Sequence, residues 1–281
     1  MADDRSEGPD TAVTAPALGT TQRTSMVERY DFETRLARFD LPGRLDEISG
    51  LAFTPDGRLF AHDDERGRIH EIDTETGQVG KRFDLGDGTV RDDFEGLAIV
   101  SDRFFLISSI GLLYEFREGA DDTQVPFRLT DTGVGSGCEV EGLEYDPVDE
   151  ALLIACKVST PDRGAVVVHR RPLDPARGVL PVLMIPRSGL AAAGLGDAFY
   201  PSGIVVDPTG TLLLVSGRHE ALIEVTRSGE LVSGLQLSRN RHPQPEGIAI
   251  SPDGRLFISD EKNGRDARLT IYARRPQGEA R

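Results

Sequence analysis

Five copies of one short motif constrain this chain more than any other feature of its sequence. In each copy a serine or glutamate precedes a glycine, and an aliphatic residue follows it. The copies are Ser49–Ala52, Glu95–Ala98, Glu141–Glu144, Ser202–Val205 and Glu246–Ala249. Their glycines are separated by 46, 46, 61 and 44 residues. A period in the forties, built from strand-like units, is typical of β-propeller blades.

Each motif opens a unit of short apolar segments separated by turn residues. In the first unit the pattern predicts strands over 48–54, 59–63, 69–73 and 79–85. The same order recurs over 94–129, 140–185 and 203–237. Four short strands in each repeat are the pattern of a propeller blade. The sequence therefore predicts an all-β propeller with four antiparallel strands in each blade.

The fifth unit supplies only three strands, over 247–251, 256–259 and 269–273. A ring of blades must close, because an open sheet edge is a pairing hazard. The extended segment 30–41 has no blade of its own, so we expect it to complete the fifth blade. This predicts five blades closed by an N-terminal strand. The alternative is six blades, with an additional blade in 172–200.

The repeat predicts one propeller domain over residues 28–275, with a disordered tail over 1–27 and a flexible C-terminus over 276–281. The net charge of −15 argues against nucleic acid as a partner, because phosphate binding needs a basic face. No apolar run is long enough to span a membrane. We expect a monomer. The compartment stays open: cytoplasmic as written, periplasmic or secreted if a signal has been removed.

The two cysteines, Cys138 and Cys156, are predicted to lie near the same end of the third blade. A disulfide between them is possible, but the sequence favours free buried thiols. Of the histidines, only His62 and His219 are expected near the channel. His70, His169 and His242 are expected at the periphery.

The residue before each motif glycine is expected to face the central channel. Three of the five are glutamates: Glu95, Glu141 and Glu246. At about 6 Å and an effective dielectric near 20, each pair repels by about 2–3 kcal/mol. Such a group must bind a cation, hold protons or pair with basic residues. Carboxylate oxygens suit Ca²⁺ or Mg²⁺, so we predict a divalent-cation site formed by these three residues and Glu47. The alternative is that the acids cap turns and the glycines only permit tight packing.

The ends of the second strands should lie at the same end of the channel. They supply candidate bases, which are Asp63, Asp64 and Asp260, and candidate substrate-binding residues, which are Lys157, Arg218, His219 and Ser109. The additional segment 187–200 is expected to be a short helix or loop on this face. The sequence has no phosphate-binding Walker loop, no His-Glu-x-x-His motif and no Gly-x-Ser-x-Gly elbow.

These motifs resemble those of the SdiA-regulated family of bacterial β-propellers. The resemblance rests on the repeated Glu-Gly-Leu/Ile-Ala segments, on Leu45–Ala52 and on Ser259–Glu261, and it covers about residues 30–275. More distantly the chain is similar to the senescence-marker-protein/gluconolactonase group and to phytase-like esterase propellers. In those groups a glutamate at the start of an inner strand coordinates a divalent cation in the channel. This implies the same role for the three motif glutamates, although no asparagine ends a second strand here.

Two functions follow as hypotheses. The first is a Ca²⁺-dependent hydrolase of a small phosphoester or lactone, in which an aspartate acts as base and Lys157 or Arg218 holds the substrate. The second is a non-catalytic propeller whose acidic channel face binds a protein, a peptide or a sugar.

Overall fold

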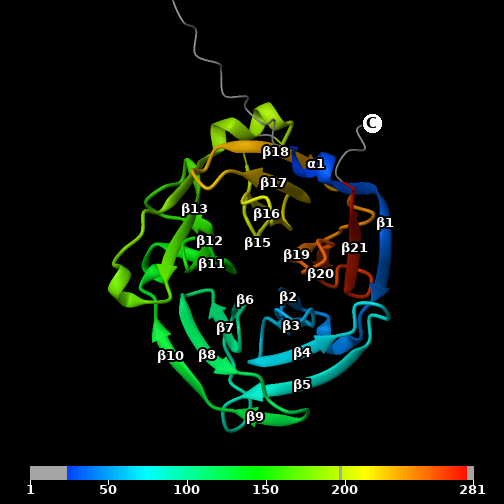
Figure 1. Ribbon diagram of the computed structural model, residues 1–281, viewed down its shortest axis with the longest axis vertical. Helices are drawn as coiled ribbons and strands as arrows, with labels where there is room; N and C mark the ends of the chain where they lie inside the picture. Colours follow the sequence, from blue (N-terminus) through cyan, green and yellow to red (C-terminus); the bar gives the residue numbers. More distant parts are fainter. Residues whose placement is uncertain (1–23, 196–197, 277–281) are drawn as a thin grey trace, which may run out of the picture.

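The structure is a computed structural model, which describes residues 24–195 and 198–276. Five antiparallel sheets follow one another around a central axis, each with one edge towards that axis (Figure 1). The predicted five-bladed propeller is therefore confirmed, and the six-bladed alternative is wrong. The tail predicted for residues 1–27 lies mostly outside the described residues, but its boundary falls inside helix α1 (Met26–Arg29).

The strands of each blade are numbered from the axis outwards. Blade 1 contains β2 (Ile48–Phe53), β3 (Leu59–Asp63), β4 (Arg68–Ile72) and β5 (Val79–Leu85). Blade 2 contains β6 (Phe94–Val100), β7 (Arg103–Ser108), β8 (Leu112–Arg117) and β10 (Phe127–Asp131). Blade 3 contains β11 (Cys138–Asp146), β12 (Ala151–Ser159), β13 (Ala165–Pro172) and β14 (Leu183–Pro186). Blade 4 contains β15 (Gly203–Val206), β16 (Leu212–Ser216), β17 (Ala221–Val225) and β18 (Leu231–Gln236).

Blade 5 takes its outer strand from the other end of the chain. Its inner strands are β19 (Pro245–Ile250), β20 (Leu256–Asp260) and β21 (Arg268–Arg274). Strand β1 (Tyr30–Asp40) pairs antiparallel with β21, which gives the sheet order β1-β21-β20-β19. The first and last strands of the chain thus lie in one blade (Figure 1), and the predicted closure by residues 30–41 is confirmed.

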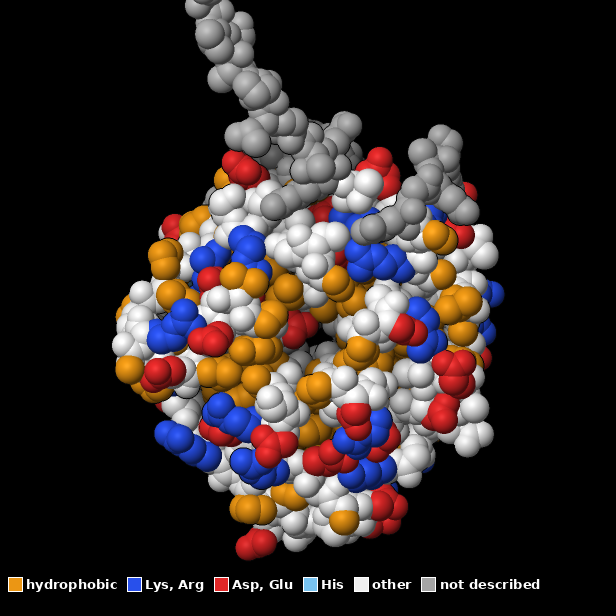
Figure 2. Space-filling model, viewed as in Figure 1, with side chains coloured by type: hydrophobic (Ala, Val, Ile, Leu, Met, Phe, Trp, Pro, Cys, Tyr) orange, Lys and Arg blue, Asp and Glu red, His pale blue; other side chains and the backbone are white. Residues whose placement is uncertain are grey.

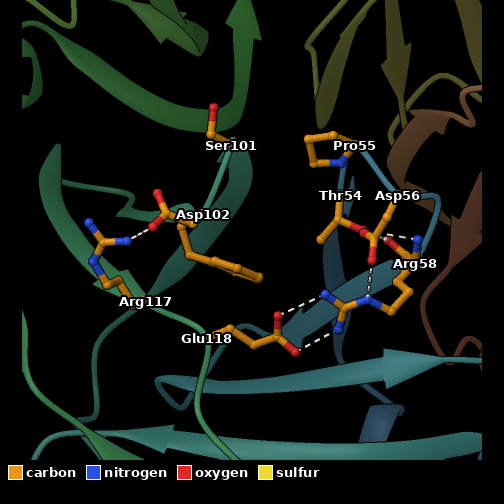
Figure 3. Close-up of a pocket in the computed structure, with 9 residues that line it drawn as sticks. Thr54, Pro55, Asp56, Arg58, Ser101, Asp102, Arg117 and Glu118 are labelled. Atoms are coloured by element: carbon orange, nitrogen blue, oxygen red, sulfur yellow. Dashed lines mark hydrogen bonds and ion pairs between the residues drawn. The ribbon is translucent and has the colours of Figure 1, made fainter.

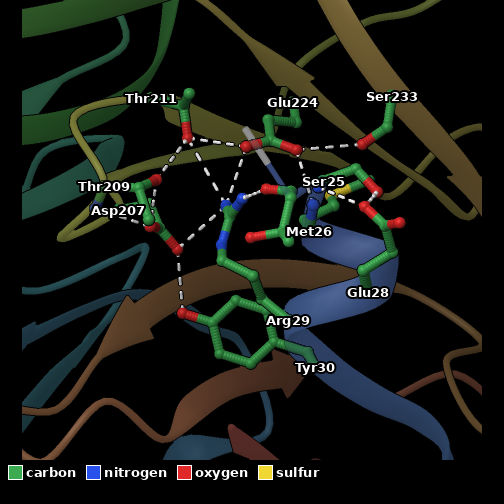
Figure 4. Close-up of polar contacts among 11 residues, drawn as sticks. Ser25, Met26, Glu28, Arg29, Tyr30, Asp207, Thr209, Thr211, Glu224 and Ser233 are labelled. Atoms are coloured by element: carbon green, nitrogen blue, oxygen red, sulfur yellow. Dashed lines mark hydrogen bonds and ion pairs between the residues drawn. The ribbon is translucent and has the colours of Figure 1, made fainter. Parts of the chain in front are cut away.

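The N-terminal segment also joins blade 5 to blade 4 through a buried polar cluster, here called the clasp (Figure 4). Arg29 lies 3.2 Å from Asp207 Oδ2 and donates a 2.7 Å hydrogen bond to Glu224 Oε1. The Tyr30 hydroxyl donates to Asp207 Oδ2 at 2.9 Å, and the backbone N–H of Met26 donates to Glu224 Oε2 at 2.6 Å. Residues that precede the closing strand therefore fix the neighbouring blade as well.

The hydrophobic core is divided among the five interfaces between blades. Each of five buried clusters combines side chains from two neighbouring blades, as Phe60 of blade 1 and Phe104 of blade 2 do. Their rings lie 5.1 Å apart in an edge-to-face arrangement, which favours aromatic pairs. The inner two strands are apolar because both of their faces are covered in this way.

The motif glycines let neighbouring blades approach closely at the axis. A Cβ atom on Gly96 would lie 2.5 Å from the backbone nitrogen of Leu143 in the next blade, closer than real Cβ contacts allow. The same clash recurs around the ring, with distances of 2.8 Å from Gly50 to Leu97 N, 2.6 Å from Gly203 to Glu246 O and 2.4 Å from Gly247 to Ser49 O. The sequence alternative, that the glycines permit tight packing, holds for the glycines themselves.

Three local features differ from the sequence predictions. Cys138 and Cys156 form a disulfide between β11 and β12, so the prediction of free thiols is wrong. A short strand, β9 (Thr123–Val125), leaves the second repeat and pairs parallel with β5 of blade 1. The helical part of 187–200, η4 (Arg187–Ala193), packs against β18 of blade 4, and Tyr200 at the end of this segment lines the channel cavity. The other 3₁₀ turns are η1 (Gly43–Leu45), η2 (Val134–Ser136) and η3 (Pro175–Arg177).

Candidate functional site

Each glutamate-bearing motif begins at an irregularity in its inner strand. The pairing register shifts between Phe94 and Gly96, between Val140 and Gly142, and between Pro245 and Ile248. A bulge of this kind bends the strand and re-aims one side chain, and bulges are common beside active sites. The redirected side chains are the motif glutamates, which meet at one end of the channel, here called the channel mouth.

The bulge also frees a backbone N–H, which the neighbouring strand satisfies. In blade 1 the N–H of Gly50 donates to Nε2 of His62 at 3.0 Å, and in blade 5 that of Gly247 donates to Oγ of Ser259 at 2.9 Å. His62 is fully buried, and burial lowers its pKa to about 4. It is a neutral structural residue.

A cavity of about 430 Å³ opens at the channel mouth between blades 3, 4 and 5. Its charged lining residues include Glu141, Glu246, Lys157 and Arg218. Figure 2 shows the molecule down its axis, with an acidic patch at the central opening. The sequence analysis named all four residues, so the structure brings these four members of its predicted site together.

Glu141 of β11 and Lys157 of β12 form a close ion pair at this cavity. Lys157 Nζ donates to Glu141 Oε1 at 2.5 Å and lies 3.5 Å from Glu139 Oε1. Burial raises the pKa of Glu141, and the lysine opposes that effect. Although burial favours the neutral amine, the bond to Glu141 raises the pKa of Lys157, so the ammonium form persists.

Among the described residues neither Glu95 nor Glu246 has an ion-pair partner, although Gln244 and Ser202 hydrogen-bond to Glu246. Burial raises the pKa of Glu95, and the charges of Glu141 and Asp93 raise it further. The pKa of Glu246 rises to about 8, first through burial and then through the charge of Glu141. The predicted repulsion among the motif glutamates therefore raises the pKa of Glu95 and of Glu246, which favours their protonated forms.

A second group of carboxylates, here called the acidic trio, lies beside the cavity. Its members are Glu47, Asp64 and Glu261, and one carboxylate oxygen from each lies within 4.8 Å of the other two. Burial and the charge of Glu47 raise the pKa of Asp64 to about 6. Gln244 lines the cavity and donates its side-chain amide to Glu261, which links the trio to the channel mouth.

The carboxylates that lie closest together differ from the predicted set of metal ligands. Among the described residues the trio is the all-carboxylate group close enough to share an ion, and Glu95, Glu141 and Glu246 do not form such a group. The reason is local: Glu141 is held by Lys157, and the motif residues project from separate blades. Of the four predicted ligands, only Glu47 belongs to the trio.

The three candidate bases have different environments. Asp64 belongs to the trio, whereas Asp63 is buried and its pKa is raised by that burial. Asp260 is fully buried, and its carboxylate accepts hydrogen bonds from His242 Nδ1 at 2.8 Å and from the Gln244 N–H at 3.3 Å. Asp260 is therefore held away from the cavity surface in this structure, and its role as a base stays a prediction. His242 is also buried, contrary to its expected place at the periphery.

The basic side of the cavity is organised by Tyr200. The guanidinium groups of Arg187 and Arg218 lie 4.8 and 5.1 Å from the centre of its ring, and His219 stacks on it at 5.4 Å. Arg218 lines the cavity, while His219 supports Tyr200 from behind. Ser109 lies beyond this lining, and its backbone joins blade 2 to Val140 of blade 3 at 2.9 Å.

The other end of the channel has a cavity of about 310 Å³ between blades 1 and 2, at the turns that follow their inner strands (Figure 3). Its charges are paired. Arg58 donates to both oxygens of Glu118 at 2.6 and 2.9 Å and to Asp56 at 3.0 Å, and Arg117 pairs with Asp102. Because these charges compensate one another, we place the candidate site at the channel mouth.

The sequence analysis missed two residues of this site as candidates, Glu261 and Gln244. Glu261 lies two residues after the end of the predicted strand 256–259, and Gln244 precedes a motif glycine by three residues. Both positions carried a usable signal, since the corresponding positions of other blades supplied Asp64, Lys157 and Glu47.

Comparison with solved structures shows which proteins share this architecture. The chain is similar to glutaminyl cyclase from Myxococcus xanthus, at 16% identity with a TM-score of 0.60, over 86% of this chain and 97% of that one. It is similar to a luciferin-regenerating enzyme at 10% identity with a TM-score of 0.54, over 86% and 96% of the two chains. A PQQ-bound aldose sugar dehydrogenase from Streptomyces coelicolor matches at 14% identity and a TM-score of 0.52, over 85% and 98%. At these identities the likeness establishes the fold alone.

No helix among the described residues has the length and apolar character needed to cross a membrane. The SdiA-regulated family model matches residues 193–270, which contain the fourth and fifth motif glycines. The resemblance to the SdiA-regulated family, predicted from the repeated motifs, is confirmed by this match over blades 4 and 5.

Proposed function

We propose that the protein is a divalent-cation-dependent hydrolase of a small phosphoester or lactone, with its active site at the channel mouth. The observation that carries the proposal is the acidic trio beside a cavity that contains basic side chains. The three structural neighbours are named for different reactions, so the choice of reaction rests on the site and not on the fold.

The trio suits a hard divalent cation. It offers only carboxylate oxygens, which Ca²⁺ and Mg²⁺ prefer. Asp64 Oδ1 is buried and has no hydrogen-bond partner among the described residues, as expected of an atom that contacts an ion. Lys262, next to Glu261 in sequence, is engaged by Asp46 at 2.5 Å and does not neutralise the trio. Ca²⁺ is our first choice, because three carboxylates and added water match its flexible coordination.

The cavity supplies the other requirements for hydrolysis. A bound cation would polarise the substrate oxygen. Arg218, which has no carboxylate partner among the described residues, is placed to hold an anionic group of the substrate. Glu246 lines the same cavity, and its pKa of about 8 lies where proton transfer at neutral pH is efficient.

The first test separates ion binding from net charge. The Glu47→Gln/Glu261→Gln double variant should bind Ca²⁺ at least about tenfold more weakly in titration calorimetry, because two of three ligands lose their charge. The matched control is Asp87→Asn/Asp162→Asn, which removes the same charge from exposed sites and should leave the affinity unchanged.

The second test addresses catalysis. Chromogenic phosphodiesters, phosphomonoesters and lactones are offered with Ca²⁺, Mg²⁺ or EDTA. We expect turnover that requires the cation and falls about 10²–10⁴-fold in Glu246→Gln, since the loss of a positioned proton-transfer group costs that much. Turnover that persists in EDTA contradicts the proposal. Cation binding without turnover of any substrate class favours the non-catalytic alternative.

A further inference from the structure

Blade 3 holds a second group of side chains of the types that bind metals, and their ligand atoms are sulfur and nitrogen in place of carboxylate oxygens. Sγ of Cys138, Sγ of Cys156 and a ring nitrogen of His169 all lie within 4.8 Å of one another. The cysteines are joined as a disulfide, and a disulfide sulfur is not a thiolate ligand. The geometry points to a metal site that is present only when this disulfide is reduced.

The sheet fixes all three residues from adjacent strands. Cys156 of β12 pairs with Val140 of β11 on one side and with Val167 of β13 on the other. His169 stands two residues further along β13, so it shares a face with Val167 and leans towards the sulfur atoms. Sites built on strands hold their ligands more precisely than sites on loops.

The state of His169 also suits a ligand. Among the described residues it makes no hydrogen bond or ion pair. Its ring is half-buried, and burial lowers its pKa, which favours the neutral imidazole that binds metals. Part of the ring reaches the surface, so a water could complete a four-coordinate shell.

The surroundings select the ion. Cys138 and Cys156 are 4% and 1% exposed, and they pack with Ile107 and Leu113 across the interface to blade 2. Two thiolates and one divalent ion carry no net charge, so such a complex can be buried among apolar side chains. Thiolate and imidazole ligands prefer Zn²⁺, unlike the all-oxygen acidic trio.

We propose that Cys138, Cys156 and His169 form a redox-controlled site for Zn²⁺ or a similar thiophilic ion. A dithiol reductant breaks the S–S bond and is itself oxidised to a disulfide. Its two electrons and two protons leave two thiols on the protein. Binding of one divalent ion then displaces those two protons to solvent. Oxidation of the thiols reforms the disulfide and excludes the ion.

The test uses Co²⁺ as a spectroscopic probe of the whole protein. The protein is reduced under anaerobic conditions, freed of reductant and titrated with Co²⁺. We expect one equivalent to bind with a thiolate-to-cobalt charge-transfer band in the near ultraviolet. Oxidised protein should lack this band. Co²⁺ at a carboxylate site gives no such band, so the acidic trio cannot imitate the result.

Three variants separate the ligands from the fold. His169→Ala leaves the disulfide intact and should weaken Co²⁺ binding to reduced protein at least about tenfold, the loss typical even of indirect contacts to a metal. His219→Ala removes a partly exposed histidine at the channel mouth and should leave Co²⁺ binding to reduced protein unchanged. Cys138→Ser should abolish the charge-transfer band in full or reduce it to that of a single thiolate.

Three results would overturn the proposal. They are reduced protein without the band, His169→Ala with unchanged affinity, and loss of the circular dichroism of the folded state on reduction. The last counts because the site requires a folded, reduced blade 3.

Discussion

The clasp and the channel mouth both remove carboxylates from water, but they differ in how those carboxylates are satisfied. In the clasp each carboxylate oxygen has two partners. For Asp207, Oδ1 accepts from the backbone N–H and the hydroxyl of Thr209, and Oδ2 contacts Tyr30 and Arg29. For Glu224, Oε1 accepts from Arg29 and Thr211, and Oε2 accepts from the Met26 N–H and from Ser233. At the channel mouth Glu95 has no side-chain hydrogen bond within the described part of the chain.

This difference distinguishes carboxylates that stabilise the fold from carboxylates that are available to a functional site. Buried polar groups in a structural role are fully hydrogen-bonded, because an unsatisfied one costs free energy. Acids left without partners must hold protons or wait for a ligand. The same argument distinguishes the channel mouth from the paired charges at the opposite end of the channel (Figure 3).

The largest expected effect comes from removing the N-terminal closure altogether. Deletion of residues 27–42 takes away β1 and the Arg29 and Tyr30 side chains of the clasp, exposing the edge of β21 and leaving Asp207 and Glu224 without their cation. We expect loss of cooperative unfolding in thermal melts followed by circular dichroism. A truncated protein that melts like the full chain would show that blade 5 closes without β1.

A single substitution then isolates the clasp. Arg29→Met leaves two buried carboxylates without their cation and should destabilise the protein by about 3–5 kcal/mol in urea denaturation. Arg35→Ala, an exposed arginine in the following strand, serves as control and should change stability by less than about 0.5 kcal/mol. Equal effects of the two substitutions would remove the distinction on which the comparison rests.

Two adjacent residues of one motif should respond in opposite ways. Gly96→Ala forces a Cβ against the backbone of Leu143 and should cost about 1–3 kcal/mol. Glu95→Gln removes a charge that the fold disfavours, so stability at pH 8 should be unchanged or higher. Gly80→Ala, with open space around its Cβ position, is the control for the glycine. Destabilisation by Glu95→Gln would mark this acid as structural.

The architecture could be predicted because it repeats. Glycines such as Gly50 and Gly96 each meet the backbone of the next blade, so one steric requirement recurs around the ring and is visible in a single sequence. The missing fourth strand of blade 5 was visible by the same count. Strand β9 could not be predicted in this way, because its parallel pairing with β5 occurs in one blade and does not repeat.

The site was less predictable, because loops and bulges place its side chains. Glu47, Asp64 and Glu261 come from three different loops, and their meeting depends on backbone directions that no period encodes. The disulfide was missed for a related reason. Spacing alone placed Cys138 and Cys156 near the same end of blade 3, but it could not show that their side chains share one face.

The smallest predicted effect concerns pH, where the two regions should act with opposite signs. Burial alone would raise the pKa of Asp207, but hydrogen bonds from Thr209 and the charge of Arg29 outweigh it and lower that pKa. The clasp therefore contributes stability at neutral pH that is lost as pH falls through the acid range. Glu246 has a pKa of about 8, raised by burial, so the folded protein binds its proton more tightly than the unfolded chain does.

Stability should therefore decline as pH rises from about 5 to about 8.5 in the presence of EDTA, because the folded state must give up that proton. Glu246→Gln should flatten this decline, whereas Asp162→Asn, an exposed control, should leave it unchanged. The measurement is the melting temperature across this pH range by circular dichroism. If Glu246→Gln kept the full slope, the protonated acid would have to lie elsewhere, and Glu246 would join Asp207 as a satisfied structural carboxylate.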